Sequence, residues 1–259
     1  MIKTIILLIA SITFIVTSAD GENDTVVQNN QKQDSEQLLI KEILHRVDEC
    51  RGALHDYSSK FTIEFYREDK LQSSSEYIVW INWTDNERCY LVRYLSPPNQ
   101  RDNLILSKDK KMWIQTKKTT RPIPITMSQR LMGDVAVGDI IDVDLSGKYD
   151  GKILQKDTSV AIDLVANTNS ALYKKIILEA DARTHLPKKA EFMTASGKPL
   201  KTAYYKLDGL FEKKKVVSEI IIIDNVNTTK ITKINFSEYK SESLPDSYFN
   251  KNYLSKIAF

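Results

Sequence analysis

The chain has few of the residues on which catalytic and metal sites are usually built. Its 259 residues include three histidines, two cysteines and eight glycines. The histidines (His45, His55 and His185) stand far apart without metal-ligand spacing, and neither Cys-x-x-Cys nor Gly-x-Ser-x-Gly occurs. Glycine-rich phosphate loops are missing, and no two carboxylates have a spacing that alone assigns them to acid–base work. We therefore predict no catalytic residue, no metal and no cofactor, and expect the function to depend on a surface.

The chain also lacks a large excess of charge of either sign. The formal net charge is only +3 at pH 7. This balance is too small to indicate nucleic acid binding or a polybasic membrane patch. We expect no nucleic acid partner.

One long apolar run is present, and it lies at the N-terminus. Lys3 precedes the almost wholly apolar segment 4–17, and the small residues Thr17-Ser18-Ala19 follow. The run is shorter than the roughly 20 residues of a spanning helix, and its flanks are those of a secretory signal peptide. We predict a signal peptide over residues 1–19, cleaved after about Ala19, and export of the mature chain to the periplasm.

The next segments predict a leader and a helix. Residues 20–35 are rich in Asn, Gln and Asp with almost nothing to bury, which predicts a disordered leader. Over 36–54, apolar residues recur at helical spacing and form one stripe. The stripe consists of Leu38, Leu39, Ile43, Leu44, Val47, Cys50 and Leu54.

From Tyr57 onward the pattern is that of strands separated by short polar turns. Short connections join antiparallel neighbours, so we expect one large meander and a single domain over 36–259. The expected strands are 58–67, 74–84, 88–95, 103–107, 112–116, 153–157, 160–166, 172–180, 188–194, 201–207, 215–224 and 229–238.

Several strands are apolar on both faces. In residues 77–83, for example, large apolar side chains fall on both alternating sets. Antiparallel sheets usually leave one face in water, so such strands need two covers. Two folds satisfy this: a closed barrel or sandwich with half-buried outer aromatics, or a curved sheet whose concave side is an apolar cavity.

A resemblance decides between these alternatives. Its motifs are Tyr94-Leu95-Ser96-Pro97-Pro98, Met112-Trp113, Arg121-Pro122, Arg130-Leu131-Met132-Gly133 and Gly138-Asp139-Ile140. With the signal peptide, the helix and the meander, they resemble the outer-membrane lipoprotein-sorting protein family, periplasmic proteins similar to the lipoprotein carrier LolA. The motifs cover about 93–149, and the general pattern extends over about 36–250.

The resemblance implies a mainly β (α+β) fold. This is an unclosed antiparallel half-barrel of about 10–12 strands, with an N-terminal helix and short lid helices around 127–142. In such carriers the apolar concavity shields acyl chains. By resemblance, the lid residues would be Leu131, Met132, Ile140 and Ile141. The cavity-lining candidates on the strands are Trp80, Trp83, Tyr90, Val92, Tyr94 and Trp113, although the pattern does not show which face is concave.

The implied partners are lipid or lipoprotein acyl chains, an inner-membrane donor and an outer-membrane acceptor, with the protein acting as a monomer. Here Val135-Ala136-Val137 replaces the small polar residues common in the family before Gly-Asp, which makes the lid more apolar. The cargo therefore stays open between a lipoprotein, a free lipid and another amphiphile. Two further hypotheses are a protein-interaction or envelope-sensor module, and a hydrolase whose residues meet only in the fold.

Two cysteines, Cys50 and Cys89, remain in a chain expected to be exported. An oxidising compartment allows a disulfide between them. The alternative is that both are small buried apolar residues. The sequence leaves these two alternatives open.

Overall fold

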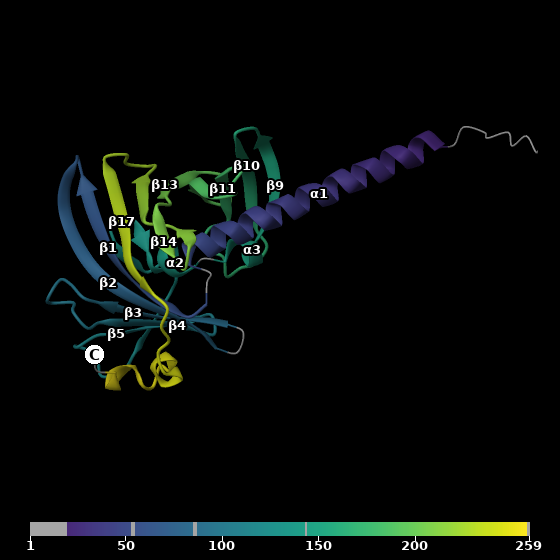
Figure 1. The fold of residues 1–259 in the computed structure, drawn as a ribbon. Helices are drawn as coiled ribbons and strands as arrows, with labels where there is room; N and C mark the ends of the chain where they lie inside the picture. Colours follow the sequence, from purple (N-terminus) through teal and green to yellow (C-terminus); the bar gives the residue numbers. More distant parts are fainter. Residues whose placement is uncertain (1–19, 53–54, 85–86, 143, 258–259) are drawn as a thin grey trace, which may run out of the picture.

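The computed structural model describes residues 20–52, 55–84, 87–142 and 144–257, and no side chain before residue 33. The signal peptide expected over 1–19 lies outside the described residues. The main feature is a strongly curved antiparallel sheet of 13 strands. Its two edge strands do not pair with each other, so the sheet is an open half-barrel (Figure 1).

The strands follow the chain as a meander with one long return. From one edge to the other they are β6 (Ile123–Ile125), β5 (Lys111–Gln115), β4 (Leu104–Lys108), β3 (Glu87–Tyr94), β2 (Lys70–Thr84), β1 (Tyr57–Arg67), β17 (Lys230–Lys240), β16 (Glu219–Asp224), β13 (Pro199–Lys206), β12 (Pro187–Met193), β11 (Lys175–Asp181), β10 (Ser159–Ala166) and β9 (Tyr149–Lys156). All neighbouring strands are antiparallel. For most of them this follows from the short turns that connect them.

The predicted unclosed half-barrel is confirmed, with more strands than expected. The edge strand β6 is a three-residue Ile-Pro-Ile segment, too short and too proline-rich to be recognised as a strand. Proline fits there because an edge strand can do without one ladder donor. The expected strand 215–224 is divided between β16 and a small ribbon, β14 (Gly209–Phe211) paired with β15 (Lys214–Val216).

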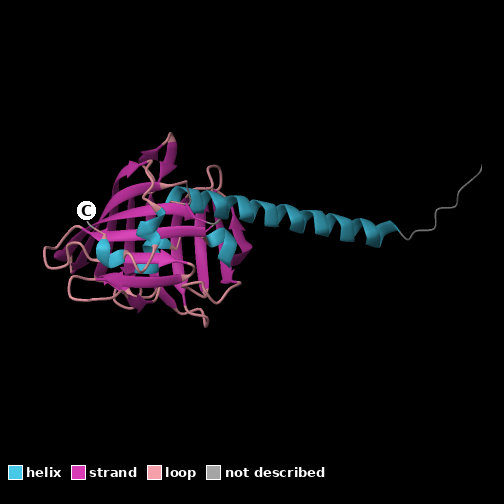
Figure 2. Cartoon of the chain, turned by 90° about the horizontal axis from the view of Figure 1, so that it is seen from below, coloured by secondary structure: helices cyan, strands magenta, loops and turns pink. Residues whose placement is uncertain are grey.

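Helix α1 (Asp20–Arg51) differs from the prediction at its N-terminal end. The segment 20–35, predicted to be a disordered leader, is helical and projects away from the sheet (Figures 1 and 2). No proline interrupts the segment, and extending an already formed helix adds one hydrogen bond per residue. The composition therefore did not predict the helical backbone of this segment.

The C-terminal half of α1 crosses the open side of the sheet and covers the edge strand β9. Ile40 lies against Gly151, where a Cβ atom would stand only 2.8 Å from the isoleucine Cγ2. Ile153 donates its backbone N–H to the Glu36 carboxylate at 3.1 Å, and Gln37 donates to the Gly151 carbonyl at 3.4 Å. The helix thus satisfies part of an edge that would otherwise be open to another strand.

A hairpin and two short helices lie within the concavity. They are β7 (Arg130–Met132), β8 (Val135–Ala136), α2 (Val137–Ile141) and α3 (Leu145–Lys148), and together they are called the lid below. The helices predicted around 127–142 are therefore confirmed only from Val137 onward. Gly133 turns the hairpin at a φ of +53°, and a Cβ there would lie 2.5 Å from the Thr232 hydroxyl.

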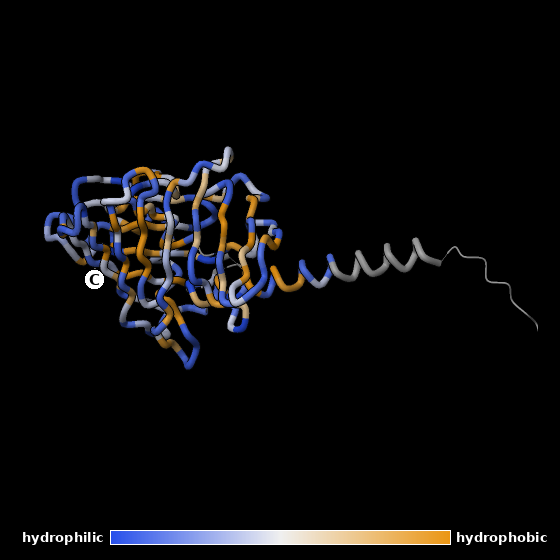
Figure 3. The backbone as a smooth tube through the Cα atoms, turned by 90° about the horizontal axis from the view of Figure 1, so that it is seen from above, coloured by the Kyte–Doolittle hydropathy of each residue, from blue (hydrophilic) through white to orange (hydrophobic). Residues whose placement is uncertain are grey.

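Two apolar layers explain why the strands are apolar on both faces. Figure 3 shows hydrophobic residues spread over many strands of the sheet. The larger layer lies on the inner face, between the sheet, α1 and the lid. The smaller layer lies on the outer face of β2 to β5. It is covered by the C-terminal segment, which contains the short helices η1 (Asp246–Phe249) and η2 (Leu254–Lys256). The second cover is thus the end of the chain itself.

Candidate functional site

The inner face of the sheet is an apolar concave wall. On β2 and β3 the residues that point inward are odd-numbered and even-numbered, respectively, and most are almost fully buried. Three of the predicted cavity residues, Tyr90, Val92 and Tyr94, belong to this face. The wall continues through β17, β16, β13 and β11 with Ile234, Ile220, Ile222, Ala203 and Ile176.

Two other predicted residues, Trp80 and Trp113, lie on the outer face. The Trp80 indole donates to the Glu242 carboxylate at 3.0 Å, and both rings pack with the C-terminal segment that covers this side. The prediction that they line the concavity was wrong. Alternate residues of a strand point to opposite faces. Val79 and Ile81 point to the inner face, so Trp80 between them points to the outer face.

Trp83 lies at the end of β2, where the inner face meets solvent. The side chain is 44% exposed, and the Arg88 guanidinium lies 5.1 Å from the centre of its ring. It borders an open groove that also contains Met127 and Ile141 of the lid side. Trp83 is therefore at the mouth of the concavity rather than within it.

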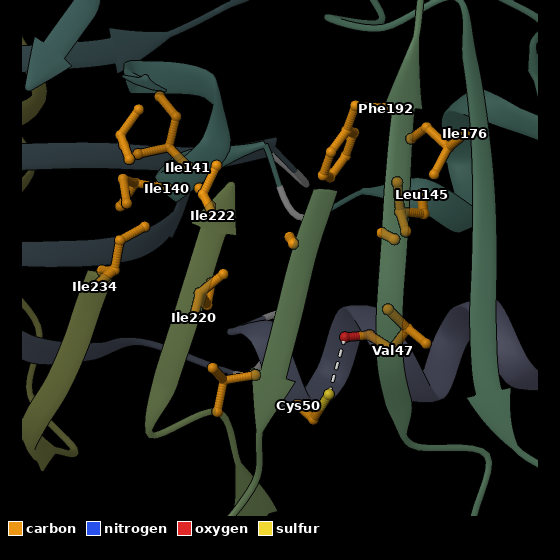
Figure 4. Close-up of a cluster of buried hydrophobic side chains, with 14 of the residues drawn as sticks. Val47, Cys50, Ile140, Ile141, Leu145, Ile176, Phe192, Ile220, Ile222 and Ile234 are labelled. Carbon is orange, nitrogen blue, oxygen red and sulfur yellow. Dashed lines mark hydrogen bonds between the residues drawn. The ribbon is translucent and has the colours of Figure 1, made fainter. Parts of the chain in front are cut away.

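All four predicted lid residues face the inner layer. Ile140 and Ile141 on α2 are buried among the isoleucines of β16 and β17 (Figure 4). Leu131 and Met132 are half-buried and pack against the same layer. They lie on β7 rather than on a helix, because residues 130–136 form a hairpin.

A buried polar cluster joins the lid to the sheet at Asp139. The Lys201 ammonium of β13 donates to one carboxylate oxygen at 2.5 Å, and the Tyr173 hydroxyl donates to the other at 2.8 Å. The side chains of Lys201 and Asp139 are only 8% and 5% exposed. Within the lid, the Ala136 backbone N–H donates to the same carboxylate at 2.7 Å. Burial, followed by the Asp139 charge, holds the pKa of Tyr173 far above its usual range, so the hydroxyl remains a donor.

Helix α3 is attached to α1 by a second buried carboxylate. Asp48 accepts the backbone N–H groups of Leu145 at 2.8 Å and Ser146 at 2.9 Å. Burial raises the pKa of Asp48, and these two hydrogen bonds oppose that shift. Nearby, Arg51 donates to the Asp139 carbonyl at 3.2 Å, so the end of α1 contacts both lid helices.

The concavity is filled in this structure. Between the lid and the wall remains a cavity of about 20 Å³, which is room for one water molecule. On the other side of the polar cluster is an open groove of about 470 Å³. Leu172 and Tyr173 line both spaces, and Lys201 lines the groove while bonding to Asp139 of the cavity. The Lys201–Asp139 pair is thus part of the partition between the cavity and the groove.

Asp139 and Lys201 were not predicted as site residues. Asp139 lies in the Gly138-Asp139-Ile140 motif, which was interpreted as shape rather than chemistry. Lys201 has the same parity on its strand as Ala203 and Tyr205, which face inward. A lysine on the apolar side of a strand was the available signal, since buried lysines need a partner.

The two cysteines are not bridged to each other. Both are buried, Cys50 in the inner layer and Cys89 in the outer layer. The disulfide alternative is therefore overturned, and the alternative of small buried apolar residues holds. Burial raises the pKa of Cys50 to about 12, and the thiol donates to the Val47 carbonyl at 3.2 Å (Figure 4).

We expect both thiols to react only after unfolding. A thiol-specific reagent should titrate two groups per chain in denaturant without reductant, and none in the native protein at neutral pH, because the thiolate is the reactive form. Finding no reactive thiol in denaturant would contradict the unbridged arrangement.

Among the described residues, no group of three His, Cys, Asp or Glu side chains could hold a metal ion. None of the helices in the described part of the chain has the length and apolar composition needed to cross a bilayer.

Comparisons with known proteins give the class. A family model with the description "Uncharacterized protein" matches residues 86–256, and the chain belongs to that family. No curated protein matches the chain. Among solved structures, a LolA superfamily protein from Nitrosomonas europaea is 27% identical, with a TM-score of 0.73, over 82% of this chain and 97% of that one.

Two further structures have the same fold at lower identity. A DUF1329 family protein from Desulfovibrio piger is 15% identical with a TM-score of 0.73, covering 85% of this chain and 99% of that one. A putative outer membrane lipoprotein-sorting protein domain from Vibrio parahaemolyticus is 17% identical with a TM-score of 0.69, covering 83% and 97%. The predicted resemblance to LolA-like proteins is confirmed.

Proposed function

We propose that the protein is a non-enzymatic carrier that binds the acyl chains of lipids or lipoproteins in its concavity. One observation carries the proposal. A continuous apolar wall across the half-barrel is covered by helices of only 5 and 4 residues, which are separate from the sheet. The lid hairpin forms no strand pairing with the 13-stranded sheet, so it can move without breaking the ladder hydrogen bonds of that sheet. The similarity to a LolA superfamily protein supports the same interpretation.

In this structure the lid lies directly against the wall. A cavity of about 20 Å³ cannot hold an acyl chain, so binding requires the lid to move away from the wall. An acyl chain would then replace the apolar contacts of Ile140 and Ile141. Each buried methylene group contributes about 0.8 kcal/mol, so a long chain offsets the loss of the lid contacts.

The proposed route follows from the predicted signal peptide. The mature protein would work in the periplasm as a monomer, receiving its cargo at the inner membrane and transferring it toward the outer membrane. The similarity to a putative outer membrane lipoprotein-sorting protein domain supports this direction. No covalent step is proposed, because shielding and release of acyl chains need only a reversible lid movement.

The position of the site can be tested with a substitution that fills the wall. Ala203 lines the cavity beneath the lid, so we expect Ala203→Leu to weaken the binding of a fluorescent fatty acid by about tenfold. The added methyl groups would occupy the space that the chain needs. The measurement is a fluorescence titration of delipidated protein, with circular dichroism to verify folding.

The matched control is Tyr204→Leu, at the next position of the same strand. Tyr204 is 43% exposed and points to the opposite face, so its replacement should leave binding unchanged. If the delipidated wild-type protein binds neither a fatty acid nor a lipopeptide, the carrier proposal fails. A stoichiometric protein partner without lipid would then favour the interaction module.

A further inference from the structure

The polar cluster at Asp139 places the negative charge on the lid and its side-chain donors on the body of the protein. Lys201 belongs to β13, and Tyr173 to the segment before β11. Both donate to the Asp139 carboxylate. When the lid moves away, this carboxylate leaves with it, while the ammonium and the hydroxyl remain in the wall.

An acyl chain that then covered the wall would leave the remaining ammonium a partly buried charge without its counterion. Lys201 has its Nζ 5.2 Å from the centre of the Tyr173 ring and 5.9 Å from that of Phe192, so its surroundings are aromatic. Its other acceptor, the Asp134 carbonyl at 3.0 Å, also belongs to the lid. A buried ammonium that loses its partner is strongly unfavourable. An opened concavity therefore favours a ligand that supplies a negative charge at this position.

The other charges near the cluster do not remove this preference. Arg51 of α1 donates to the Asp139 carbonyl, and its Nε has no hydrogen-bond partner within the described chain. Arg51 belongs to α1 rather than to the sheet, and its charge interacts with both Asp48 of the same helix and Asp142 of the lid. Asp142 of the lid is paired with Lys148 of the lid. The positive charge left on the wall is therefore that of Lys201.

The location fits an amphiphile with its head at Lys201. The apolar cavity begins beside this residue, with Phe192 and Ala203 in its lining. The open groove, which Lys201 and Tyr173 also line, leads to solvent. A headgroup between the two spaces would keep contact with water while its chain entered the concavity.

We propose that Asp139 occupies the place of the ligand's headgroup, and that the preferred ligand is an anionic amphiphile with a carboxylate or phosphate group next to its acyl chain. This inference rests on the proposed carrier function and specifies its ligand class. In the closed state the lid carboxylate takes the two donors of the wall. In the loaded state the anionic headgroup would accept the hydrogen bonds of Lys201 and Tyr173 instead.

The test compares three ligands that share one acyl chain. These are oleate, oleoyl lysophosphatidate and uncharged monooleoylglycerol, measured by displacement of a neutral fluorescent probe from delipidated protein. We expect at least one anionic ligand to bind about tenfold more tightly than monooleoylglycerol. Tight binding of oleate alone would identify a carboxylate, and tight binding of lysophosphatidate alone would identify a phosphate.

Two variants assign the preference to the cluster. Asp139→Asn removes the competing carboxylate, so it should strengthen anionic binding more than neutral binding. The double variant Lys201→Met/Asp139→Asn removes both charges without leaving one unpaired. Whatever its absolute affinities, it should bring the ratio of anionic to neutral affinity, measured within the variant, close to one. Lys206→Met, an exposed lysine of the same strand, is the control and should keep the preference.

Equal affinity for charged and uncharged ligands in the wild type would overturn the headgroup proposal and leave the carrier proposal intact. A preference that survives in the double variant would also overturn it. Failure of all three ligands to bind would refute the carrier function itself.

Discussion

Replacing Lys201 by methionine is expected to lower the free energy of unfolding by about 3–5 kcal/mol. The substitution removes the ammonium from a pair whose side chains are 8% and 5% exposed. Methionine keeps the length of the side chain but leaves the Asp139 carboxylate buried without its counterion. Urea denaturation monitored by tryptophan fluorescence measures the change.

Two controls separate charge from packing. The double variant Lys201→Met/Asp139→Asn should recover most of the lost stability, since asparagine still accepts from Tyr173 and no charge remains unpaired. Lys206→Met breaks an exposed pair with Asp208, whose side chains are 63% and 59% exposed, and should have almost no effect. If the single variant is as stable as the double variant, the pair does not hold the lid as described.

Phe61→Ala is expected to lower the free energy of unfolding by about 3–5 kcal/mol as well. Phe61 lies on the central strand β1, is 1% exposed, and stacks on Tyr77 with ring centres 4.9 Å apart. Truncation would leave a cavity that the flanking strands cannot close, because their hydrogen bonds fix the distance between them. Chemical denaturation gives the size of the loss.

The matched control for Phe61 is Leu71→Ala on the neighbouring strand β2. Leu71 is 54% exposed, so its truncation removes little buried surface and should change stability only slightly. A comparable loss for both variants would show that the inner layer at β1 is less well packed than the structure indicates.

The architecture was predictable because its signals are local. Period-two alternation in segments such as 58–67 and 229–238 fixed most strands within a few residues. Short polar turns fixed their antiparallel order. The stripe on the C-terminal half of α1 likewise predicted which side is buried, although Leu38 is exposed. The very short strands β6 to β8 were not predicted, because two or three residues are too few to show an alternating pattern.

The faces of the sheet were not predictable from β2 alone. Both sets of alternating residues are apolar there, so the pattern could not distinguish Trp80 from Val79 as inward. Which face is the outer one depends on the C-terminal segment. There Phe249 and Leu254 of a mostly polar stretch pack against the outer face. Contacts between residues so far apart in the chain leave no local signal.

The sequence by itself determined the longer strands, the buried side of α1 and the LolA-like class, because alternation, turns and motifs are properties of neighbouring residues. The tertiary structure alone decided which tryptophans lie outside, that Cys50 and Cys89 are apart, and that Lys201 meets Asp139. The last two are separated by 62 positions. Such a pairing depends on the curvature of the whole sheet and on the position of the lid within it. No single segment of the sequence specifies either of them.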